Sequence, residues 1–126
     1  LFVLIDVKPH AVFERDGTTI LCSVPISIAQ GILGTTIKVP TIGGEVELKI
    51  PHGTQSGTVF KLRGMGLPDL RGYRQGDQLI TVHVETPTKL SKKQKELIKE
   101  FDELSTPKTY PQRKRFIDKI MPKGSK

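Results

Sequence analysis

The first two thirds of the chain consist of short runs in which every second residue is apolar. Ile20, Cys22, Val24 and Ile26 alternate with residues that face the opposite way, which is the period of a strand with one buried face. Pro25 within this run indicates an edge position or a strand end. Comparable runs predict further strands at 1–7, 35–39, 45–50, 59–63 and 78–84.

One short helix interrupts this strand pattern. Ser27 can cap a helix over residues 28–33, and Gly34 can end it. Residues 64–76 form a long connection rich in Gly, Pro and Arg. Short strands separated by frequent turns predict a mainly β fold, an antiparallel two-layer β-sandwich with one short helix and a C-terminal amphipathic helix.

The apolar spacing changes to that of a helix after residue 90. Ser91 and Gln94 form the S-x-x-Q pattern of a capping box. The large apolar residues that follow share one helical face, and charged residues occupy the other; the apolar ones are Leu97, Ile98, Phe101 and Leu104. A lone helix of about four turns is marginal in water. This stripe therefore has to be buried, either on the sandwich of the same chain or on a second copy.

The C-terminal tail carries a second apolar face. Thr106 and Pro107 end the long helix, and a short helix is predicted near residues 113–121, where one face collects Phe116, Ile117, Ile120 and Met121. Together with Tyr110 these residues offer enough apolar area to dock the tail on a dimer partner or on its own sandwich. The rival interpretation is a free basic tail that binds acidic partners.

The net charge of +7 lies outside the β-rich part. Residues 1–88 hold eight basic and eight acidic side chains, whereas residues 89–126 hold twelve basic and five acidic ones. A neutral body argues against a basic nucleic-acid surface built into the sheets. One alternative that stays open is a small basic nucleic-acid-binding β module that uses the tail and the arginine-rich loop around Tyr73, formed by Arg63, Arg71 and Arg74. A carbohydrate-binding β-sandwich is the other, although the chain has no Trp and only two Tyr for such a site.

Residues that bear reactive chemistry are scattered along the chain. His10, His52 and His83 stand in no metal-ligand spacing, and Cys22, the single cysteine, excludes an internal disulfide. Glu45 and Glu47 share a strand face with Lys49, which is typical of a solvated surface. We therefore expect no enzyme activity, no catalytic residues, and no metal or cofactor site. No apolar run approaches the ~20 residues of a membrane span.

Several phrases along the chain resemble the C-terminal region of the DnaJ family, the J-domain heat-shock co-chaperones. They occur in the family's order over residues 1–104, and the most specific is Val59 to Pro68 followed by Gly76 to Pro87. The other phrases are Lys8-Pro9-His10 with Val12 to Gly17, Val24-Pro25-Ile26-Ser27, Leu33-Gly34, Ile50-Pro51 with Gly53 to Gly57, and Leu90-Ser91-Lys92-Lys93-Gln94.

The resemblance implies a domain order and a function. Residues 1–16 would end a preceding β-subdomain, 17–88 would form the C-terminal β-sandwich subdomain, 89–105 a dimerisation helix and 106–126 a basic tail. The family holds unfolded polypeptide clients and delivers them to a DnaK-type ATP-dependent chaperone. Expected partners are therefore a second copy, such clients and, through the parent chain, that chaperone, in the cytoplasm or in an organelle matrix such as that of mitochondria.

The same resemblance limits what the chain is expected to do alone. Its sequence contains no His-Pro-Asp signature, no Gly/Phe-rich linker and no repeated C-x-x-C-x-G-x-G module. We take it as a piece of a longer protein that carries zinc upstream, if it is of the zinc-containing type. The resemblance assigns dimerisation to Leu97, Ile98, Phe101 and Leu104, and leaves the client-binding residues unknown, because the family's main client groove lies in the first subdomain.

Overall fold

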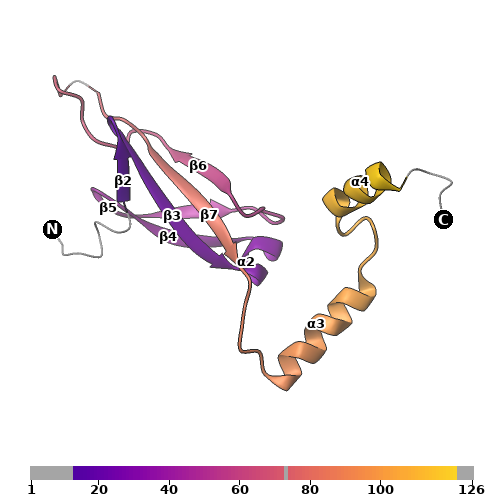
Figure 1. The fold of residues 1–126 in the computed structure, drawn as a ribbon. Coiled ribbons are helices and arrows are strands. Elements are labelled where there is room, and N and C mark those ends of the chain that lie inside the picture. The colour runs from indigo at the N-terminus through magenta and orange to yellow at the C-terminus, as the bar shows by residue number, and fades with distance from the viewer. Residues whose placement is uncertain (1–12, 73, 122–126) are drawn as a thin grey trace. The chain divides into compact units, whose positions relative to one another are not determined.

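The computed structural model describes residues 13–72 and 74–121, and it divides the chain into two units, 1–87 and 88–126 (Figure 1). The predicted strand at 1–7 lies outside the described residues. The first unit contains six described strands and one helix: β2 (Phe13–Asp16), β3 (Thr19–Ser27), α2 (Ile28–Leu33), β4 (Thr35–Thr41), β5 (Gly44–Ile50), β6 (Thr58–Leu62) and β7 (Gln78–Glu85). The second contains α3 (Lys92–Leu104) and α4 (Pro111–Ile120).

The strands form two sheets, as the alternation predicts. One sheet has the order β2-β3-β7-β6, and the other pairs β4 with β5. The β2–β3, β6–β7 and β4–β5 pairs are antiparallel, whereas β3 and β7 run parallel in register from Ile20 opposite Gln78 to Ser27 opposite Glu85. The mainly β, two-sheet prediction is confirmed, and the parallel pair refines it. Three strands intervene between β3 and β7, so the pairing cannot be predicted from hairpins between strands that are neighbours in the sequence.

The core lies where the apolar faces of the two sheets meet. It consists of Ile26 from β3, Ile80 and Val82 from β7, and Val39, Leu48 and Ile50 from β4 and β5. A hydrogen bond also joins the sheets, because Gln78 Nε2 donates to the Pro40 carbonyl at 2.9 Å while the whole Gln78 side chain is buried. Each fully buried large aliphatic side chain contributes about 2 kcal/mol to the free energy of unfolding, so this cluster is the main source of the stability of the β body.

The glycine-rich connection after β6 is tied to the sheet by its own backbone. Gly66 N–H donates to the Gly76 carbonyl at 2.9 Å, Gly76 N–H donates to Leu67, and Leu67 N–H donates to Thr18, both at 2.8 Å. A Cβ built on Gly66 or Gly76 would overlap the Thr18 carbonyl oxygen. Both positions therefore require glycine for close backbone approach rather than for a phosphate loop.

The helix boundaries follow the capping residues found in the sequence. Ser27 and Ser91 each form a complete capping box, in which Ser91 Oγ accepts from Gln94 N–H at 3.1 Å and Gln94 Oε1 accepts from Ser91 N–H at 2.8 Å. α4 has Pro111 at its start, where a missing N–H costs nothing. The predicted tail helix is confirmed, although it begins two residues earlier than expected.

Candidate dimerisation surface

The apolar stripe of α3 is open within the described residues of the second unit. Its large side chains retain 49% (Leu97), 44% (Ile98), 43% (Phe101) and 79% (Leu104) of their possible exposure, and no residue of α3 is buried. The capping box at Ser91 fixes where the helix starts, and the helical spacing of these four residues places them on one face. We call Leu97, Ile98, Phe101 and Leu104 the α3 face.

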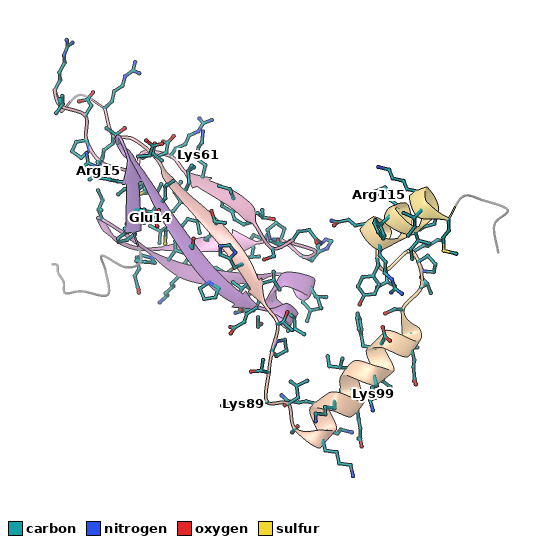
Figure 2. All side chains as sticks on the ribbon, viewed as in Figure 1. Glu14, Arg15, Lys61, Lys89, Lys99 and Arg115 are labelled. Carbon is teal, nitrogen blue, oxygen red and sulfur yellow. The ribbon has the colours of Figure 1, made fainter. Side chains whose placement is uncertain are left out.

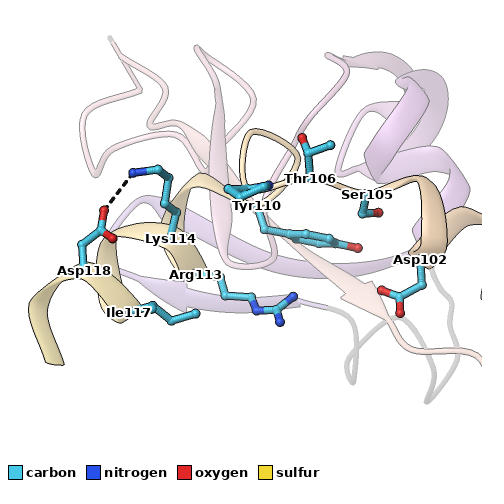
Figure 3. A pocket seen from close by; sticks show the side chains of 9 residues that line it. Asp102, Ser105, Thr106, Tyr110, Arg113, Lys114, Ile117 and Asp118 are labelled. Carbon is cyan, nitrogen blue, oxygen red and sulfur yellow. Dashed lines mark hydrogen bonds and ion pairs between the residues drawn. The ribbon is translucent and has the colours of Figure 1, made fainter. Parts of the chain in front are cut away.

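α4 presents a second open face in the same unit. The large apolar residues in this helix and at its two caps are between 39% and 61% exposed: Tyr110, Phe116, Ile117, Ile120 and Met121. We call these five residues the α4 face. α3 and α4 leave a hollow of about 440 Å³ between the end of α3 and the first turns of α4, and Tyr110 and Ile117 contribute to its wall (Figure 3).

Among the described residues of the second unit, one ion pair borders this hollow. Lys114 Nζ and Asp118 Oδ2 form an ion pair at 2.8 Å, drawn as a dashed line in Figure 3. Asp102 and Arg113 also line the hollow, but no ion pair joins them. Acidic side chains near the C-terminal end of a helix interact unfavourably with its dipole. A cationic group beside Asp102, near the C-terminal end of α3, would therefore be stabilising.

The β body carries a smaller, mostly apolar hollow beside α2. It measures about 280 Å³ and lies between α2 and the loop at 53–56, with Ile28, Ile32 and Val84 in its wall. Gly31 allows this close packing, since a Cβ there would lie 3.2 Å from Val84 Cγ2. Ile32 and Leu33 remain 49% and 76% exposed at this end of the body. Sequence patterning missed this surface because a six-residue helix shows too few turns to define a face.

The other candidate residues do not assemble into a reactive centre. In the described ranges no group of three or more His, Cys, Asp or Glu side chains could hold a metal ion, and His10 lies outside them. Arg63, Arg71 and Arg74 are exposed on the loop, with Leu70 fully exposed near its tip, and Tyr73 lies outside the described residues. No helix in the described part of the chain is both long and apolar enough to cross a membrane.

Cys22 is buried in β3, and desolvation raises the pKa of its thiol above the ordinary value. The reactive thiolate is therefore scarce at pH 8 and is also shielded by the fold. We expect a disulfide reagent such as dithiobis-nitrobenzoate to label the native chain at least tenfold more slowly than the chain in denaturant. Equal rates would place Cys22 at the surface and contradict the packing of β3.

Comparison of the sequence with protein-family profiles assigns the chain to a family. The profile described as "DnaJ C terminal domain" matches residues 1–87, and the one described as "Chaperone protein DnaJ C-terminal region" matches residues 93–120. The chain belongs to the DnaJ C-terminal domain family. The second profile covers α3 from its second residue and all of α4, so both helices lie in the matched region.

Close relatives of this DnaJ C-terminal region carry the name Chaperone protein DnaJ. The protein of Geobacillus thermodenitrificans (strain NG80-2) is 57% identical over 104 residues, which cover 82% of this chain and 27% of that protein. Those of Geobacillus sp. (strain WCH70) and Bacillus velezensis are 50% and 52% identical, and each match covers 95% of this chain and 32% of the relative. The chain thus spans about a third of the length of these relatives.

Proposed function

We propose that this chain is the dimerisation and client-holding C-terminal region of a DnaJ-type co-chaperone that delivers unfolded polypeptides to a DnaK-type chaperone. The observation that carries the proposal is the open α3 face, Leu97, Ile98, Phe101 and Leu104, on a chain of the DnaJ C-terminal family. The role is non-catalytic, and the parent protein would act in the cytoplasm or, as the alternative, in an organelle matrix. The nucleic-acid alternative gains no support from the comparisons.

A second copy is the natural cover for the α3 face. An exposed cluster of large apolar side chains on one helix face marks an interaction site more often than a solvated surface. A two-fold axis lets two copies of the same face bury one another. The proposed domain order is the one expected from the sequence, with residues 89–105 as the dimerisation helix. The boundary at residue 16 stays a proposal, since β2 pairs with β3 and residues 1–12 lie outside the described residues.

Dimerisation would also serve client holding. Two linked β bodies raise the effective concentration of the second contact once an unfolded chain has bound the first. The open apolar residues at the end of α2, Ile32 and Leu33, support a holding role for the β body. Contact with the DnaK-type chaperone would come through the parent chain, whose J domain and any zinc module would lie upstream.

The proposed split between this C-terminal region and the upstream domains of the parent protein predicts what the chain does alone. We expect no stimulation of the ATPase of a DnaK-type chaperone, because the chain has no His-Pro-Asp signature. We also expect the chain to delay the aggregation of a denatured client only weakly, because the main client groove of the family lies in the first subdomain. Light scattering of a heat-denatured client, with albumin as the control, measures the second effect.

Two outcomes would change the proposal. Stimulation of the ATPase would remove the need for an upstream J domain. Suppression of aggregation at a one-to-one ratio to the client would show that this β body carries a complete client site of its own.

A further inference from the structure

The open surface of the second unit is larger than the α3 face. Phe116 is 61% exposed and Ile120 is 59% exposed, more than any residue of the α3 face except Leu104. Phe116, Ile117 and Ile120 follow helical spacing on one side of α4, and Tyr110 and Met121 flank the two ends of the helix, so a single partner surface can cover them. Nothing in the described part of the unit buries them.

The exposed apolar area of the two faces can be compared with the area that a stable dimer buries. Taking about 200 Å² for a fully exposed side chain of this size, the α3 face offers roughly 400 Å² per copy. Specific dimers bury about 800 Å² per partner, and contacts of half that size belong to weak encounters. The α4 face adds roughly 500 Å² per copy. The two faces together reach the standard size, and the α3 face alone does not.

The charges of the two helices are complementary. α3 has its basic residues mainly in its first half, while Glu100, Asp102 and Glu103 gather near its end. α4 carries four basic residues and one acidic residue, and of these basic residues only Lys114 forms an ion pair with another described residue. Glu100 and Asp102 flank the α3 face, and Arg113 and Lys119 lie on or beside the α4 face. Flanking charges of this kind select partners in helix–helix interfaces.

From these observations we infer that α4 is the second half of the dimer interface, and that its apolar and basic surface packs against α3 of the other copy, where Glu100 and Asp102 receive its cations. The inference rests on the proposed dimer and adds a partner for α4. The hollow lined by Tyr110 and Ile117 lies at the junction of the two faces, where a large side chain of the second copy would enter.

A charge exchange between two chains tests this arrangement. One variant carries Glu100→Lys and Asp102→Lys, which places positive charge where the α3 dipole favours it and so preserves the helix. The other carries Arg113→Glu and Lys119→Glu. Each variant alone meets like charges across the interface. We expect its dimer dissociation constant at low salt to rise by at least tenfold in sedimentation velocity runs.

Mixing the two variants is the decisive step. In the mixed dimer, the acidic α4 faces a basic α3 and the basic α4 faces an acidic α3, so heterodimers should form with near wild-type affinity. This rescue should fade at 1 M salt, where charges are screened beyond about 3 Å. An intrachain contact between α3 and α4 would give no rescue on mixing, and that result would overturn the inference.

The outcomes also separate this inference from the proposed dimer. If the α4 variant dimerises as tightly as the wild type, α4 is no part of the interface. The carboxylates of α3 then pair with other cations, for example with lysines of the partner's α3. In that case the α3 face still stands as the dimer contact. If the wild type itself is monomeric, the proposed dimer fails first.

Discussion

Replacing Phe101 with Asp should convert the dimer into a monomer. Phe101 lies at the centre of the α3 face and is 43% exposed where the second unit leaves it open. A two-fold interface contains the residue twice, and loss of a central aromatic contact costs about 2 kcal/mol or more each time. The dissociation constant should therefore rise roughly a thousandfold. Size-exclusion chromatography with light scattering measures the change.

Lys99→Asp is the matched control for this substitution. Lys99 lies on the exposed polar side of the same helix (Figure 2), so the variant introduces the same residue and an even larger change in charge. It should remain a dimer. Circular dichroism should show the strand signal unchanged in both variants. A dimeric Phe101→Asp variant, or a monomeric Lys99→Asp variant, would move the contact away from the α3 face.

The second large effect is expected at Gly76, where alanine should destabilise the β body by about 3 kcal/mol or more. A Cβ there overlaps the Thr18 carbonyl, and this contact is backbone, which cannot rotate away. The same segment carries the hydrogen bonds from Gly76 to Leu67 and from Leu67 to Thr18. The melting temperature of the β body should fall by about 15 °C.

Gly43→Ala serves as the control for Gly76→Ala. A Cβ at Gly43 meets no atom within 4 Å, and Gly43 is absent from the glycines with positive φ. Its melting temperature should therefore change by no more than about 3 °C, because the expected effect is within about 0.5 kcal/mol. Equal melting temperatures for the two variants would show that the connection after β6 is not held against Thr18.

The sequence predicts most elements of this fold because their periods are clear. Ile20, Cys22 and Ile26 alternate along β3 and are all buried, and the capping boxes at Ser27 and Ser91 start their helices as expected. β2 was missed, since its four residues Phe-Glu-Arg-Asp hold one apolar position and show no alternation. The parallel pairing of β3 with β7 was also missed, because it depends on contacts between residues almost sixty positions apart.

The candidate site was predictable only as a pattern on a helix. The 3.6-residue spacing identifies Leu97, Ile98, Phe101 and Leu104 as one face, and the second unit leaves that face open. Periodicity does not say what covers a face, since packing on the same chain and packing on a second copy require the same apolar stripe. The hollow beside α2 depends on the close approach of Gly31 to Val84, which no local pattern encodes.

The mass of the wild-type chain in solution tests the central claim most directly. One copy has a mass of 14.0 kDa. Sedimentation equilibrium from low to high micromolar concentration should give twice that value, with dissociation appearing only on dilution. A mass of 14.0 kDa maintained at high micromolar concentration would contradict the account, because no second copy would then cover the α3 and α4 faces.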